Sequence, residues 1–128
     1  MPRIAQLTEL DRIVRSGTVA SALQPDASVG GDVSNLVATG NITLSGPTNP
    51  VDAQVLRFRV RAQGADRTVT FSSTSTPKIV ASTGITLGPY TVPRGRVLIA
   101  ALEYCADRRT STDAADPAWV LTAATVSG

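Results

Sequence analysis

The stretch LRFRVRAQ, residues 56–63, alternates apolar side chains with the guanidinium groups of Arg57, Arg59 and Arg61. Successive side chains of a β-strand point to opposite faces, so this period of two predicts a strand with one core face and one cationic face. Any fold for this chain must therefore cover one side of the strand and accommodate a row of cations on the other.

The chain from residue 41 onward is a series of short β-branched runs separated by turn residues. The runs are NITLSG, QVLRFRVRA, RTVTFSS, TPKIVASTGITLGPYTVP, RGRVLIAALEYCA and AWVLTAATVS. Strands at this spacing predict an all-β fold, either an antiparallel β-sandwich or a jelly-roll-like barrel. RGRVLIAALEYCA is apolar nearly throughout, as expected of a central strand that is buried on both faces.

Residues 1–38 have a different character, with weak periodicity and many small and turn-forming residues. TELDRIV, residues 8–14, is compatible with one short helix, with Thr8 as N-cap and Asp11 three residues later. Such a segment buries too little apolar surface by itself to offset its chain entropy, so it is either a flexible tail or an arm that orders against a partner. We therefore expect an extended N-terminal arm over residues 1–38 and a β-sandwich domain over residues 39–128.

Composition restricts the function classes. The chain has 128 residues, which suits one domain, and 12 basic residues against 10 acidic ones, a net charge of +2. A nucleic-acid-binding domain usually carries a larger, clustered basic excess with exposed aromatic residues, so no nucleic-acid partner is expected. The start MPRIAQLTEL has no signal-peptide layout, and no apolar run reaches the length of a membrane helix. We expect a soluble protein with no membrane partner.

Catalytic and metal-binding patterns are missing from the sequence. It has no histidine, the usual general base and commonest metal ligand, and Cys105 is its one cysteine. Cys105 lies in an apolar run and is expected to be a buried structural thiol. Most aspartates lie in turn-rich stretches, where the carboxylate normally accepts hydrogen bonds from nearby backbone. Glu103, inside a strand run, is expected to pair with an arginine. We expect no enzyme activity, no cofactor and no metal.

Residues 40–125 resemble a β-domain that recurs in virion proteins of tailed bacteriophages, both tail fibres and head decoration (capsid cement) proteins. The segments PTNPVDAQVLRFRV, ADRTVTF, VPRGRVLIAALEY and DPAWVLTAA carry the resemblance. The chain departs from the pattern at Ala53, where glycine is common, and at Arg96, where lysine is common. Alanine at position 53 argues against a turn with positive φ there.

The resemblance implies a structural protein of the virion, and a short arm followed by a β-domain favours a head decoration protein over a tail fibre. We expect it on the capsid surface after assembly in the host cytoplasm, binding the outer surface of the major capsid protein lattice and stabilising the shell. By analogy with the symmetry of icosahedral shells, we expect a homotrimer. The residues expected to bind partners are Arg3, Ile4, Leu7, Leu10, Ile13 and Val14 of the arm and Arg57, Arg59 and Arg61 of the strand.

Two interpretations of the three arginines remain open. They form charge-assisted bonds to carboxylates on a neighbouring subunit or shell, or they form a solvated face with Glu or Asp across the sheet. Two other functions also remain open for the chain. One is a tail fibre or receptor-binding tip domain. The other is a carbohydrate-binding module, which requires Trp119 to be exposed, whereas the run AWVLTA indicates that it borders the core.

Overall fold

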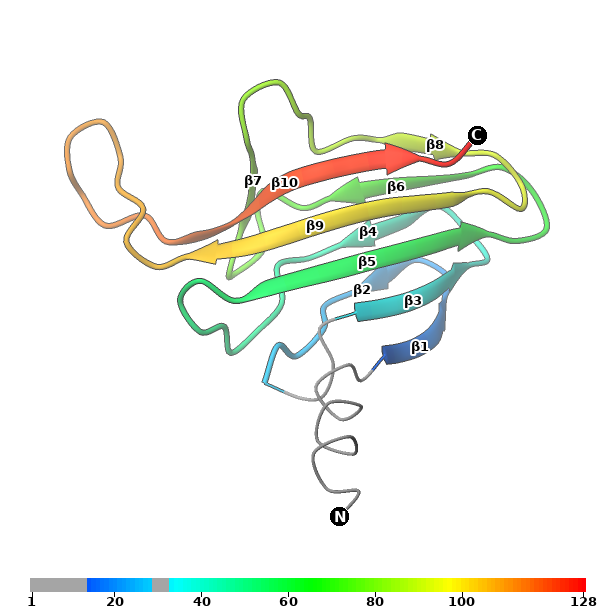
Figure 1. The fold of residues 1–128 in the computed structure, drawn as a ribbon, viewed down its shortest axis with the longest axis horizontal. Coiled ribbons are helices and arrows are strands. Elements are labelled where there is room, and N and C mark those ends of the chain that lie inside the picture. The colour runs from blue at the N-terminus through cyan, green and yellow to red at the C-terminus, as the bar shows by residue number, and fades with distance from the viewer. Residues whose placement is uncertain (1–13, 29–32) are drawn as a thin grey trace, which may run out of the picture.

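A computed structural model of the chain describes residues 14–28 and 33–128. Within these residues the protein is all β, with strands arranged in two mixed sheets and no helix. The six-stranded sheet has the order β1 (Val14–Val19), β3 (Val33–Ala38), β5 (Val55–Ala62), β9 (Val97–Cys105), β10 (Ala118–Val126) and β7 (Ile79–Ala81). The four-stranded sheet has the order β2 (Ala22–Leu23), β4 (Ile42–Leu44), β6 (Arg67–Phe71) and β8 (Tyr90–Val92) (Figure 1).

The first six strands form a stack of three coils, β1–β2, β3–β4 and β5–β6. In each coil the chain runs through the six-stranded sheet, bends, and continues in the four-stranded sheet. As a result β1, β3 and β5 are parallel neighbours, and so are β2, β4 and β6. A parallel pair needs a long crossover connection, and here the strand in the opposite sheet is part of that connection.

The later strands close the stack with mostly antiparallel pairs. β9 runs antiparallel to both β5 and β10, and β8 runs antiparallel to β6, whereas β7 is parallel to β10. The expectation of an antiparallel fold was therefore wrong for five of the eight strand pairs in the described residues. Alternating side chains indicate which face of a strand is buried, but they do not reveal the direction of its neighbour.

The faces of the two sheets that point inward share one hydrophobic core. Its side chains come from both sheets and are mostly β-branched or leucine, with Phe58, Phe71 and Trp119 as the largest. Trp119 is fully buried, donates its Nε1–H to the Pro47 carbonyl at 2.9 Å, and packs edge-to-face on Tyr104. This one side chain therefore ties β10 to the loop after β4.

The strands expected from residue 41 onward are confirmed, but the segment expected to be an arm is different. From Val14 to Ala38 the described residues include β1, β2 and β3, which belong to the two sheets. Thr39 N–H donates to Val19 C=O at 3.0 Å, and Thr43 N–H donates to Ser21 C=O at 2.9 Å. These strands are stabilised by pairing with distant residues, which local sequence patterns do not reveal. The expected helix at residues 8–14 falls almost entirely outside the described residues.

A second correction concerns the turn before β5. Ala53 has φ of +66°, in the left-handed region, although alanine there argued against such a turn. Ala53 N–H donates to Tyr104 C=O at 2.9 Å, and Gln54 N–H donates to Val51 C=O at 3.0 Å. These bonds join the turn to β9 and maintain a backbone conformation that costs a residue with a Cβ about 1–2 kcal/mol.

Candidate partner-binding face

The outer surface of the six-stranded sheet carries the arginines singled out by the sequence. Along β5 the inward residues are buried, and Arg57, Arg59 and Arg61 are exposed on the opposite side. The strand prediction for this stretch is confirmed residue by residue. A strand rises about 3.3 Å per residue, so side chains two positions apart start about 7 Å from one another. At that distance in water, neighbouring guanidiniums repel by well under 1 kcal/mol, and the sheet tolerates the row.

The strands beside β5 place no carboxylate opposite these arginines. On β9 the partners of Arg57, Arg59 and Arg61 are Ala101, Ile99 and Val97. On β3 they are Val33, Asn35 and Val37. The interpretation in which Glu or Asp lies directly across the sheet is therefore wrong.

The three guanidinium groups have no internal partner within the described part of the chain. Both ion pairs found there involve Asp116, with Lys78 and with Arg108. Glu103 lies opposite Val55, two pairs further along the β5–β9 ladder than Arg57, and forms no ion pair among these residues. The expected pairing of Glu103 with an arginine is therefore not found. The donors of the arginine row are available to a group outside the described chain.

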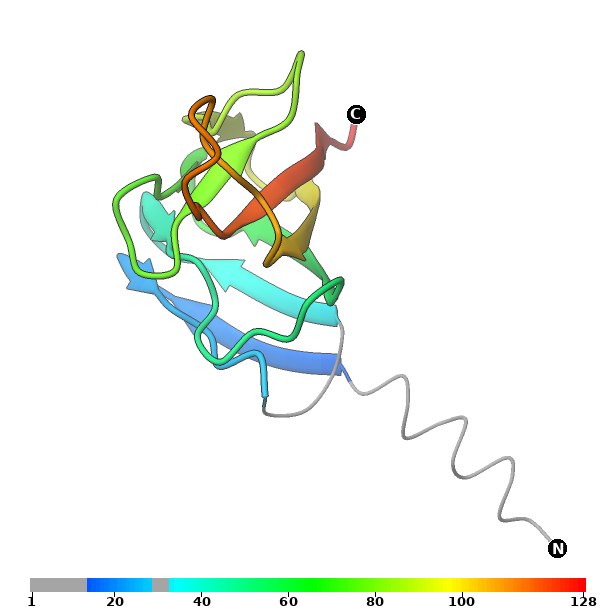
Figure 2. The same ribbon diagram turned by 90° about the vertical axis from the view of Figure 1, so that its left-hand side faces the viewer.

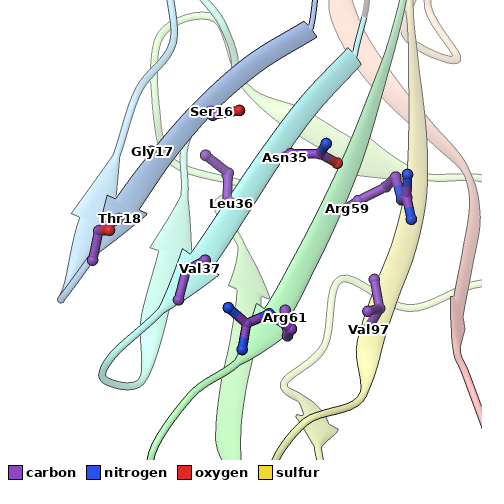
Figure 3. Close-up of a pocket in the computed structure, with 9 residues that line it drawn as sticks. All are labelled: Ser16, Gly17, Thr18, Asn35, Leu36, Val37, Arg59, Arg61 and Val97. Carbon is purple, nitrogen blue, oxygen red and sulfur yellow. The ribbon is translucent and has the colours of Figure 1, made fainter.

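A shallow, open depression of about 550 Å³ crosses the outer face beside the arginines. The strand register forms two rows across β1, β3 and β5 (Figure 3). The first row consists of Ser16, Asn35 and Arg59. The second row, two residues further along each strand, consists of Thr18, Val37 and Arg61. Guanidinium, amide and hydroxyl groups together suit an anionic or carboxylate-bearing partner. Because the depression is wide and open, it fits a surface of another macromolecule better than an enclosed small ligand.

Apolar side chains border the arginine row. Ile99 on β9 is 45% exposed, and Val55 at the start of β5 is 41% exposed. The prediction that β9 is buried on both faces is therefore wrong, because its outer face belongs to this exposed surface. We call the outer-face residues of β5 and their neighbours on β1, β3 and β9 the arginine face. Charge and apolar area side by side are typical of protein-binding surfaces.

Of the remaining sequence-predicted site residues, Val14 is brought to the arginine face, because it is in register with Val33 on β3, which is in register with Arg57 on β5. Arg3, Ile4, Leu7, Leu10 and Ile13 lie outside the described residues, and Val14 begins β1. Sequence reasoning missed Ser16, Thr18 and Asn35. Their one available signal was alternation in VSNLVA and RSGTV, which is weak because the residues involved are small and polar.

The cations near Asp116 have a structural role. Lys78 Nζ lies 2.6 Å from one carboxylate oxygen, and Arg108 contacts the other. Hydrogen bonds from Lys78, and then from Arg108, hold the pKa of Asp116 below its usual range despite some burial. This cluster fastens the loop between β9 and β10 to the residue that precedes β7.

Other polar groups serve turns. Asp26 accepts the backbone N–H of Ser28, Asp52 that of Ala106, and Asp66 that of Arg94, each at 2.9 Å. The expected hydrogen bond to nearby backbone is confirmed for Asp26, whereas Asp52 and Asp66 each join turns that are distant in the sequence. Cys105 is half-buried rather than buried, and desolvation together with nearby carboxylates raises the pKa of its thiol. A thiol with a raised pKa is a poor nucleophile.

Neither a metal cluster nor a membrane span is found in residues 14–28 and 33–128. No group of three or more Cys, Asp or Glu side chains there is placed to hold a metal ion. No helix there is long and apolar enough to cross a membrane. Comparison of the chain with protein-family models, with curated proteins and with solved structures found no match.

Proposed function

We propose that this protein is a head decoration (cement) protein of a tailed bacteriophage, bound to the outer surface of the major capsid protein lattice. The observation that carries the proposal is the arginine face, where Arg57, Arg59 and Arg61 are exposed and none has a carboxylate partner within the described chain. The resemblance of residues 40–125 to virion β-domains supplies the biological setting.

The arginine face would bind carboxylates that the capsid subunit presents. Each guanidinium can donate two parallel hydrogen bonds to one carboxylate, which fixes orientation as well as charge. The exposed Ile99 and Val55 add apolar contact at the margin of the row. Single contacts of this kind are weak, and repetition over a lattice of identical sites makes the coat stable.

The proposed β-sandwich architecture suits this role. Two sheets around one core leave the outer face of the larger sheet free for docking, while the inner face stabilises the domain. Trp119, which a carbohydrate-binding module would need on its surface, is fully buried. That observation favours a protein partner over a sugar.

The test is the copy number of this chain in purified virions, measured by mass spectrometry against the major capsid protein. A decoration protein is expected at a ratio of roughly one copy per capsid subunit, or a fixed simple fraction of it. A few copies per particle would contradict the proposal and indicate a tail fibre or receptor-binding tip. Absence from virions would reject a structural role in the particle altogether.

A further inference from the structure

The two sheets end differently at opposite ends of the molecule. At one end the terminal strands are β1 and β2, the first coil of the parallel stack, and within the described residues each pairs on one side alone. At the other end they are β7 and β8. Figure 2 shows β1 as the outermost described strand at its end of the sheet.

The far end is protected against pairing with another strand. β7 and β8 have three residues each. Pro77 and Lys78 precede β7, and Pro89 and Pro93 flank β8. Short edge strands, prolines and lysines are the features by which proteins prevent edge-to-edge association.

The β1 edge has none of these features over its described side chains. β1 has six residues, and residues 16–23, SGTVASAL, contain neither a charge nor a proline. Ser16, Gly17 and Thr18 are all exposed. This edge is open to pairing. The charged residue of β1, Arg15, precedes residues 16–23, so the segment that would meet an identical edge carries no charge of its own.

The direction of the backbone groups follows from two hydrogen bonds of the ladder. Val19 C=O accepts from Thr39 N–H, so it points toward β3. Ala38 C=O accepts from Gln63 N–H, so alternate residues of β3 point the other way, toward β5. By the same alternation, the N–H and C=O groups of Ser16 and Thr18 point away from β3, toward the open edge.

We propose that two copies of this chain associate through these edges, with β1 of one copy antiparallel to β1 of the other. The register is centred on Gly17, so that Ser16 of one copy pairs with Thr18 of its partner and the reverse. That register uses the outward N–H and C=O groups of both residues. Gly17 then lies opposite its own copy at the close spacing of a non-hydrogen-bonded pair, about 4.5 Å between Cα atoms.

Gly17 suits this central position. A Cβ built on it would meet only Leu36 Cδ2, at 4.0 Å, so the inward side of the edge has room at this point. The inference does not depend on the capsid proposal, because it rests on the outward backbone groups of Ser16 and Thr18 and not on the arginine side chains. It also differs from the trimer expected from shell symmetry, since this pairing has twofold symmetry.

Sedimentation equilibrium of the full chain over a range of concentrations tests the association. We expect a dimer, twice the chain mass of 13.3 kDa. Thr18→Pro removes an N–H that points to the open edge and leaves the β1–β3 ladder intact. It should raise the dimer dissociation constant at least about tenfold. Thr18→Ala keeps the N–H and should remain dimeric, which makes it the matched control.

Disulfide trapping tests the register independently of whether Thr18→Pro folds well. In a Cys105→Ser background, Gly17→Cys should crosslink two copies on mild oxidation, because the expected Cα separation lies within the disulfide range. Ser21→Cys, exposed but outside the pairing, should not. A monomer at all concentrations, a trimer, or a dimer indifferent to Thr18→Pro would each overturn the inference. So would a monomer that dimerises only when residues 1–13 are deleted.

Discussion

The two faces of β5 show how one strand meets two different requirements. Its inward residues, Leu56, Phe58, Val60 and Ala62, are at most 5% exposed and lie in the shared core. Its outward residues are three exposed arginines with no internal partner in the described chain. The fold requires the first set. Nothing in the described fold requires the second, and that difference is why we assign the arginines to a partner.

The inner face should be the more sensitive to truncation. Phe58→Ala removes a side chain that is 1% exposed and leaves a cavity between the sheets, so it should lower the free energy of unfolding by about 3–5 kcal/mol. Arg59→Ala, the adjacent residue on the other face, should change it by less than about 0.5 kcal/mol. Urea unfolding measures both. Equal losses at the two positions would remove the distinction between the faces.

The outer face should be the more sensitive in binding. Arg59→Glu should weaken binding to purified shells at least about tenfold, because it replaces an attraction by a repulsion at the centre of the arginine face. The Tm of the free protein should hardly change. Arg109→Glu, in the exposed loop between β9 and β10, is the control for net charge. Shell occupancy that is unaltered by Arg59→Glu would argue against the proposed binding face.

Lys78 and Arg108 differ from the arginines of β5, because both are paired with a carboxylate, that of Asp116. The pKa of the Asp116 carboxyl is lowered in the folded protein, so the unfolded chain binds this proton more readily. The stability from this pairing is therefore complete above about pH 4–5 and is lost as the pH falls toward the lowered pKa. Asp116→Asn should have a lower Tm than the parent at pH 7, with the difference shrinking toward pH 3. A constant difference across that range would contradict the ionic origin.

The smallest effect is expected at the turn that leads into β5. Ala53 has positive φ, which glycine adopts without strain. Ala53→Gly should raise the free energy of unfolding by up to about 1 kcal/mol, since relief of strain exceeds the added freedom of the unfolded chain. Gln63→Gly, next to Gly64, is the control: Gln63 does not have a positive φ, so glycine relieves no backbone strain there. A decrease for Ala53→Gly would indicate that the turn is not strained.

The sequence predicted strands well where one face is strongly apolar. β5, β6, β9 and β10 were all expected, because Leu, Val and Phe alternate with polar residues or form apolar runs. β1, β2 and β3, all within the segment expected to be an arm, were missed because the small and polar residues among them carry little burial signal. The exposed outer face of β9 was also missed, since Ile99 and Val97 look like core residues in sequence.

The arginine face was predictable only in part. Alternation placed Arg57, Arg59 and Arg61 on one side of a strand, which is a local property. Their neighbours on β3 and β9 depend on pairings between residues 24 to 44 positions apart, as Val33 with Arg57 and Arg57 with Ala101 illustrate. No local pattern specifies which strands become neighbours, so the missing carboxylates could not be foreseen.

The position of Trp119 gives the protein a natural optical reporter. It is the one tryptophan of the chain, fully buried, with its indole N–H bound to Pro47. Its emission should lie at short wavelength in the folded state and shift to the red when water reaches the ring. Because the indole joins β10 to the loop after β4, the shift should follow the loss of that connection, and no label is needed to observe it.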